Sequence, residues 1–325
     1  MSKLRAPWLH TAVAALALPL LTPGCVDDGA DVGEATGTEA PDGLADDLTA
    51  LVSYTVTASG DIRGRKLYAV SSDLEDAQQD EELQLAIWAE ARTVFESHLR
   101  WVNTFVVFTD GADGTLAQVF TGQRDPTRWA LAVDQEDALD ENGEVGGDAL
   151  TFTLVHELAH IVSLNAEQVE LDADLAADPE DLDLIAAARA DCDTYFLDEG
   201  CSLPDAYIYA FHEAFWTDLV DYEAIIDAIE DEAAQEEAIA AQYAETPERF
   251  VSEYAATNVA EDFAESFATF ALEAHREGGL ERDEKVKFFE QFPELVALRD
   301  DLQGAGLSVT MSSLAPRHAR AHRCR

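Results

Sequence analysis

The pattern of hydrophobic and polar positions divides the chain into a mixed early half and a nearly all-helical later half. Residues 51–58 alternate in polarity and are rich in β-branched side chains, which predicts a strand. Residues 81–102 carry apolar side chains at helical spacing, which predicts a long helix. Short apolar runs predict three further strands, at 105–108, 117–120 and 129–133. The early half is therefore expected to combine one helix with several strands.

Helical periodicity dominates the chain after Gly147. It predicts a series of helices, the last of them broken by Pro293, at 149–164, 205–229, 232–243, 259–275 and 284–302. No internal repeat is evident. Strands followed by a run of helices predict one α+β domain, which we place at residues 50–306.

The N-terminus has the pattern of a processing segment. Lys3 and Arg5 precede a nearly continuous apolar stretch at 8–21, which predicts a signal peptide at residues 1–24. Gly24-Cys25 then resembles a bacterial lipoprotein signal, so Cys25 is expected to carry a lipid; plain secretion and an uncleaved anchor are the alternatives. Residues 25–49 are acidic and poor in apolar side chains, which predicts a disordered tether. A basic tail is expected at 307–325.

The charge balance narrows the possible partners. The chain has 66 acidic and 20 basic residues, a formal net charge of −46. Binding to nucleic acid or to an anionic membrane surface requires clustered Lys and Arg, so both are excluded. We expect an exported monomer at the cell surface or released from it, which touches the membrane only through its lipid anchor. The acidity is typical of proteins exposed to salt or calcium.

The cysteines agree with export. Cys192 and Cys201 lie close together in an acidic segment and are expected to close a short disulfide loop, two free thiols being the alternative. Cys324 is left over in the basic tail, and the sequence does not indicate its state.

A metal-binding motif lies in the helix predicted at 149–164. His156, Glu157 and His160 form an HExxH sequence flanked by apolar residues. The i,i+4 spacing places the two imidazoles one turn apart on one face, where both can reach one zinc ion. Glu157 can then accept a proton from a water that the metal activates. A surface helix with two stray histidines is the alternative, and the apolar flanks disfavour it.

A third ligand is expected about one hundred residues later, because a catalytic zinc takes three protein ligands and leaves one position open. Glu261 and Glu265 lie on one face of a predicted helix among aromatic residues, where each carboxylate needs a partner. Zinc would be the partner of Glu261, and a ligand histidine that of Glu265. Asn258 is expected to cap this helix. His212 and His275 are weaker candidate ligands, and no calcium-loop motif is present.

These two blocks resemble a known family. HExxH followed by Tyr-x-x-x-Asn-x-x-Glu-x-Phe-Ala-Glu-x-Phe at 254–267 is similar to the catalytic domain of lethal-factor-type zinc peptidases, which include the proline–proline endopeptidases. The resemblance implies that Glu261 is the third zinc ligand, that Tyr254 faces the scissile carbonyl and that Glu265 supports a ligand. It also implies a zincin fold, a twisted mixed sheet packed on the active-site helix with a mainly helical C-terminal half. The long acidic insert at 165–250 departs from the family.

The sequence thus predicts a zinc-dependent endopeptidase that hydrolyses extracellular proteins. Its substrate is expected to lie extended beside an edge strand, for which residues 129–133 are the candidate. Tyr254 would donate to the developing oxyanion. A catalytically silent zinc-binding lipoprotein with a structural or adhesive role is the alternative function.

Overall fold

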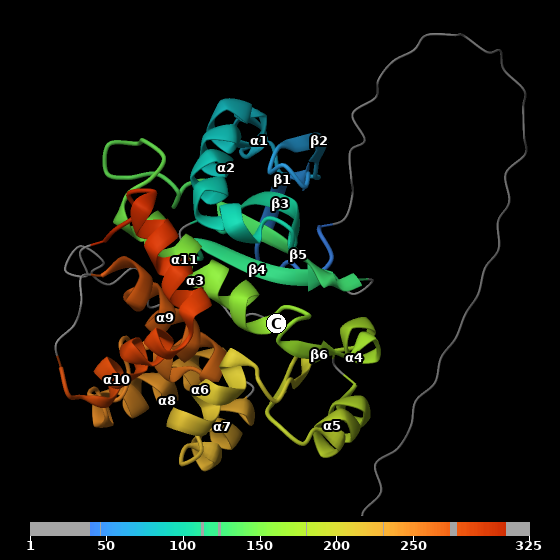
Figure 1. Ribbon diagram of the computed structural model, residues 1–325. Coiled ribbons are helices and arrows are strands. Elements are labelled where there is room, and N and C mark those ends of the chain that lie inside the picture. The colour runs from blue at the N-terminus through green and yellow to red at the C-terminus, as the bar shows by residue number, and fades with distance from the viewer. Residues whose placement is uncertain are drawn as a thin grey trace, which may run out of the picture. The chain divides into compact units, whose positions relative to one another are not determined.

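The computed structural model describes residues 40–45, 47–111, 114–122, 125–179, 181–229, 231–273 and 278–309 (Figure 1). The predicted signal peptide, Cys25, His275 and Cys324 lie outside these residues. Among the helices that are described, none combines the length and the hydrophobicity needed to cross a membrane.

A five-stranded mixed sheet forms the early half of the domain (Figure 1). Its strands are β1 (Thr49–Val56), β2 (Ile62–Leu67), β3 (Val102–Thr109), β4 (Ala117–Gly122) and β5 (Asp125–Asp134), in the order β2-β1-β3-β5-β4. β3 and β5 run parallel, and the other neighbours are antiparallel. Together with the helices that follow, this sheet confirms the predicted α+β class.

Both faces of the sheet are covered, because successive side chains of a strand point to opposite faces. Phe105 and Val107 of β3 belong to the main core, whereas Val106 and Phe108 belong to a smaller cluster on the other face. Leu44 and Leu48 complete that smaller cluster and are buried. The folded domain therefore begins before residue 50, and the end of the expected tether is part of it, because these leucines supply apolar surface to the sheet.

Two long helices pack on the main core face. α2 (Glu81–Phe95) follows the short α1 (Glu75–Gln79) and begins at Asp80, whose side chain accepts a hydrogen bond from the Leu83 amide. It is shorter than predicted, because a 3₁₀ turn, η1 (Glu96–His98), leads directly into β3. α3 (Asp148–Leu164) is buried along nearly its whole length.

From α6 onward the described chain is helical, as predicted. The elements of this part are α6 (Tyr207–Phe215), α7 (Val220–Asp227), α8 (Glu232–Glu245), η2 (Tyr254–Ala256), α9 (Val259–Leu272), α10 (Glu281–Phe288), η3 (Phe289–Gln291) and α11 (Pro293–Gly304). Edge-to-face aromatic contacts join them, with the Phe263 and Phe289 rings perpendicular at 5.1 Å. The chain stays folded to Val309, whose amide donates to the Leu272 carbonyl, so the expected basic tail begins a little later than residue 307.

The helix predicted at 205–229 is two helices in the structure, α6 and α7. Neither glycine nor proline marks the break. Arg249, distant in sequence, donates to the Phe215 carbonyl at the end of α6 and forms an ion pair with Asp218 in the turn. A tertiary contact therefore ends α6 where local periodicity would continue it.

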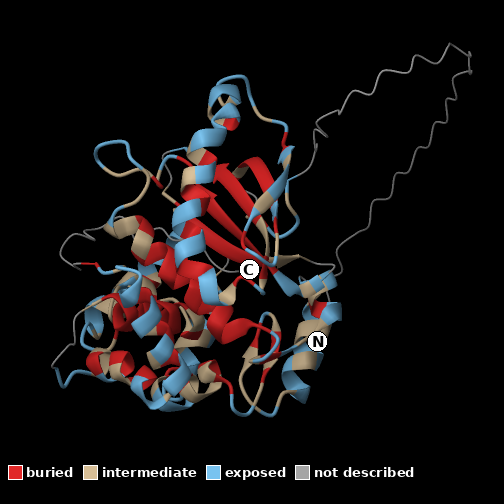
Figure 2. Ribbon diagram, turned by 45° about the horizontal axis from the view of Figure 1, so that its top comes forward, coloured by how far each residue is buried: buried red, intermediate tan, exposed pale blue. Residues whose placement is uncertain are grey.

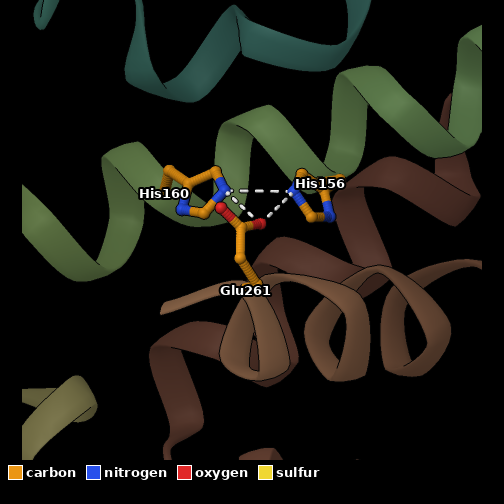
Figure 3. A group of neighbouring side chains, drawn as sticks. All are labelled: His156, His160 and Glu261. Carbon is orange, nitrogen blue, oxygen red and sulfur yellow. Dashed lines mark hydrogen bonds and ion pairs between the residues drawn. The ribbon is translucent and has the colours of Figure 1, made fainter. Parts of the chain in front are cut away.

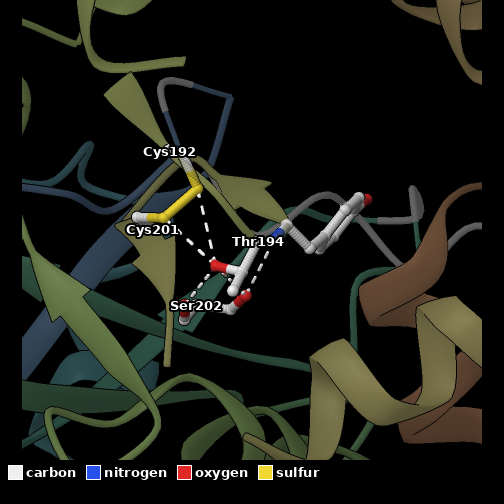
Figure 4. The surroundings of a disulfide bond; sticks show 5 residues. Cys192, Thr194, Cys201 and Ser202 are labelled. Atoms are coloured by element: carbon white, nitrogen blue, oxygen red, sulfur yellow. Dashed lines mark hydrogen bonds between the residues drawn. A yellow bond between two sulfur atoms is a disulfide. The ribbon is translucent and has the colours of Figure 1, made fainter. Parts of the chain in front are cut away.

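The segment at 165–250 has two structurally different parts. Its first part holds β6 (Val169–Leu171), α4 (Ala173–Ala177), α5 (Leu182–Asp191), β7 (Phe196–Leu197) and β8 (Gly200–Ser202), with the strands in the order β6-β8-β7. Cys192 and Cys201 are joined by a disulfide, and the Thr194 hydroxyl contacts both sulfurs and donates to the Ser202 carbonyl (Figure 4).

The second part of that segment belongs to the core. Phe211 of α6 and Trp216 are completely buried. By contrast, α5 has no buried residue, and Figure 2 shows its surroundings as exposed or intermediate while the central strands of the sheet are buried. The segment expected as one insert is thus a peripheral subdomain followed by core helices.

Candidate metal centre

α3 presents two histidines on one face. The helix begins after Gly147, whose φ of 95° lies in the region that favours glycine. His156 and His160, one turn apart, are only 4% and 1% exposed, and their Nε2 atoms lie 3.0 Å apart. Two imidazole nitrogens facing each other at this distance inside an apolar helix bundle require a shared proton or a shared ion.

α9 brings a carboxylate to the same point. Asn258 caps this helix, its side chain accepting from the Glu261 amide at 2.9 Å. Glu261 Oε2 lies 3.1 Å from His156 Nε2 and 3.3 Å from His160 Nε2, and the residue is 1% exposed (Figure 3). Two helices separated by about a hundred residues therefore meet in one buried triangle of ligand atoms.

The dimensions of this triangle fit a tetrahedral zinc ion. Zn–N and Zn–O bonds of about 2.0–2.1 Å give ligand-to-ligand separations of about 3.3–3.4 Å in a tetrahedron. The three atom pairs lie 3.0, 3.1 and 3.3 Å apart. In the described part of the chain, no fourth histidine, cysteine or carboxylate joins the group. The donor set could therefore hold a metal and leave one position for a substrate or water, as catalytic sites do.

Glu265 orients the first histidine. Its Oε1 lies 3.0 Å from His156 Nδ1, and its Oε2 accepts a hydrogen bond from Ser252 Oγ at 2.7 Å. A carboxylate behind a ligand imidazole fixes the tautomer that leaves Nε2 free for the metal. The structure thus places Glu265 where the sequence predicted, and it adds Ser252, which no local pattern indicated.

Glu157 lies beside the triangle and is held by the sheet. Its Oε2 accepts a hydrogen bond from the Val119 amide of β4 at 2.8 Å, and the residue is 4% exposed. Burial raises the pKa of Glu157 to about 7, against the opposing charges of His156 and His160. A carboxyl with a pKa near neutrality can both accept and return a proton at physiological pH.

The charges inside the triangle are strongly coupled. Burial alone would lower the pKa of His156, but hydrogen bonds and charges from Glu261 and Glu265 raise it well above its ordinary value. Burial would raise the pKa of Glu261, and the charges and hydrogen bonds of His160 and His156 lower it instead. Metal binding at such a site is coupled to proton release, because imidazole and carboxylate ligands bind in their deprotonated forms.

Tyr254 lies at the edge of the centre. It begins the 3₁₀ turn η2 just before α9, and its ring centroid is 5.7 Å from that of His156. The ring is only partly buried. The Tyr254 ring therefore lies beside the His156 imidazole.

The expectation that residues 129–133 form the edge strand is wrong. They belong to β5, which pairs with β3 on one side and β4 on the other, and Trp129 is 1% exposed. β4 forms the edge on this side of the sheet instead, and β2 forms the opposite edge. β4 is also the strand whose Val119 amide reaches Glu157, so its edge lies directly beside the metal centre.

The remaining candidate ligand that is described lies elsewhere. His212 of α6 stacks on Tyr195 with ring centroids 4.2 Å apart, and it does not join the triangle. Sequence reasoning also missed the buried pair of Asp262 and Lys285, which lies next to Glu261 in α9. Lys285 lies in a stretch so rich in charge that it is typical of an exposed helix.

No protein-family model, curated protein or solved structure matches the chain. The resemblance to lethal-factor-type peptidases therefore rests on the two motifs.

Proposed function

We propose that this protein is a zinc-dependent endopeptidase of the zincin type. The observation that carries the proposal is the buried triangle of His156, His160 and Glu261 with Glu157 beside it. A purely structural zinc site would fill its fourth position with a protein ligand and would have no use for a buried general base. Both features favour catalysis over the silent zinc-binding alternative.

The architecture supports the same family. A mixed sheet packs on the helix that carries HExxH, its edge strand β4 runs beside that helix, and the third ligand comes from the helical later half (Figure 1). This is the arrangement that the resemblance to lethal-factor-type peptidases implies. The disulfide between Cys192 and Cys201 supports an exported protein, because such bonds persist in oxidising compartments.

The residues divide the chemistry among them. A bound zinc ion would supply Lewis-acid activation of water and of a substrate carbonyl. Glu157, poised near neutrality, takes the proton of the attacking water and later gives it to the leaving amine. Tyr254 donates its hydroxyl hydrogen to the oxygen on which negative charge develops.

The outer edge of β4 suggests how a peptide is aligned. The Val119 amide donates its hydrogen bond to Glu157 instead of to a neighbouring strand, so this edge of β4 faces the proposed catalytic groups. An extended peptide pairing with β4 through main-chain hydrogen bonds would pass directly over the metal centre. The proposed substrate is therefore an unfolded or extended segment of an extracellular protein.

A peptide-library digest of the zinc-loaded mature protein tests the proposal. We expect cleavage by the wild type and none by Glu157→Gln, while both bind one equivalent of zinc. Glu82→Gln, on the exposed face of α2, is the matched control and should cleave normally. One equivalent of zinc with no cleavage by any of the three proteins would refute the peptidase and leave the silent zinc-binding role.

A further inference from the structure

A buried ion pair lies immediately beside the third metal ligand. Asp262 follows Glu261 in α9, and its Oδ2 accepts hydrogen bonds from Lys285 Nζ of α10 at 2.5 Å and from Trp216 Nε1 at 2.8 Å. Ser266 Oγ, one turn later, donates to Asp262 Oδ1. Both charged side chains are completely buried. The carboxylate is thus held from two other parts of the chain, the end of α6 and α10.

Aromatic rings enclose the ammonium group of this pair. Lys285 Nζ lies 4.2 Å from the ring centroid of Phe250 and 5.9 Å from those of Phe215 and Trp216. A lysine is almost never fully buried without a partner. Replacing such a buried pair by apolar side chains of similar volume is often neutral or stabilising, so stability does not by itself account for it.

The geometry supplies another explanation. Glu261 makes its described side-chain polar contacts with His156 and His160 only, so nothing but the ligand set itself orients its carboxylate. Asp262 is the next residue on the same turn, and it is anchored to Lys285 of α10 and to Trp216 at the end of α6. Any rotation or slide of α9 that moved Glu261 would stretch the bonds to Lys285 and Trp216.

We propose that the Asp262–Lys285 pair is a positioning device that fixes the first turn of α9, so that Glu261 presents its carboxylate to the metal at bonding distance. The proposal rests on the metal centre proposed above. Lys285 and Asp262 touch neither the substrate nor the metal, and they act through the orientation of Glu261. Supporting groups of this kind typically change metal affinity by about 10–100-fold when they are removed.

The double variant Asp262→Asn/Lys285→Met tests the proposal. Asparagine keeps an acceptor for Trp216 Nε1, and methionine fills the aromatic cage without leaving an unpaired charge. We expect a folded protein whose zinc dissociation constant rises by about 10–100-fold and whose Co²⁺-substituted form has a shifted visible absorption spectrum. Val52→Ala, in the buried strand β1 far along the sheet, is the control for general destabilisation and should leave the Co²⁺ spectrum unchanged.

The outcomes are distinguishable. Unchanged zinc affinity and an unchanged Co²⁺ spectrum in the double variant would overturn the proposal. If the double variant does not fold, Trp216→Phe is the second test, because it removes the indole donor to Asp262 and keeps an aromatic ring beside Lys285. A shifted spectrum supports the positioning device, and an unchanged one refutes it. A wild-type protein that binds no zinc would instead refute the metal centre itself. All of these readouts are independent of peptidase turnover.

Discussion

Replacing Glu157 should stabilise the metal-free protein at neutral and alkaline pH. Glu157 is 4% exposed, and burial raises its pKa from the usual 4.5 to about 7. The folded state therefore holds a proton that the unfolded chain releases above pH 4.5. Its contribution to stability is full below that pH and is lost as the pH rises to about 7. Above about pH 7, the Glu157 carboxylate must be buried in its charged form, which destabilises the folded state.

The size of the effect follows from the shift. A difference of about 2.5 pKa units corresponds to about 3 kcal/mol of unfolding free energy. Gln at this position carries no charge and keeps an oxygen that accepts from the Val119 amide, now 2.8 Å from Glu157 Oε2. Glu157→Gln should therefore be about 3 kcal/mol more stable than the wild type at about pH 8, and nearly equal to it below pH 4.5.

Urea unfolding in the presence of a chelator measures this difference at several pH values. Glu236→Gln, on the exposed surface of α8, is the matched control, and its stability difference from the wild type should not change with pH. A gain for Glu157→Gln that is the same at about pH 5 and about pH 8 would refute the reasoning, because the effect would then not come from buried charge.

Three further predictions concern single sites. Tyr254→Phe should lower kcat by about 10²–10³-fold, the usual loss for one oxyanion donor, with zinc content unchanged by metal analysis; an unaltered kcat would exclude the donor role. Asn258→Ala should cost about 1 kcal/mol in urea unfolding, because the Glu261 amide loses its cap. Cys192→Ser with Cys201→Ser opens a loop of sequence separation 9 and should cost about 2–3 kcal/mol in the same assay; no change would contradict the chain-entropy argument.

The parts of the site that the sequence predicts are those set by helical spacing. His156 and His160 are one turn apart on α3, and Glu261 and Glu265 are one turn apart on α9, so each pair is oriented by its own helix. That α3 and α9 bring these pairs together could be predicted only from the family resemblance, because no local pattern shows that residues 105 positions apart are in contact.

The parts that the sequence does not predict depend on contacts between distant segments. Which strand lies at the edge depends on the order of pairing, although the unbroken apolar run from Trp129 to Val133 was itself typical of an interior strand. The end of α6 depends on Arg249, and the burial of Lys285 depends on Asp262. For α6 and for Lys285, a long-range polar contact overrides what the surrounding residues favour.

We propose that His156, His160 and Glu261 together bind one zinc ion. Zinc K-edge X-ray absorption of the purified, zinc-loaded protein tests this proposal most directly. We expect one equivalent of zinc, bound by two imidazole nitrogens and one carboxylate oxygen at about 2.0–2.2 Å, with no sulfur ligand. In Glu261→Ala the oxygen ligand from the protein should be lost. Sulfur coordination at about 2.3 Å, or a spectrum that Glu261→Ala leaves unchanged, would contradict the proposal.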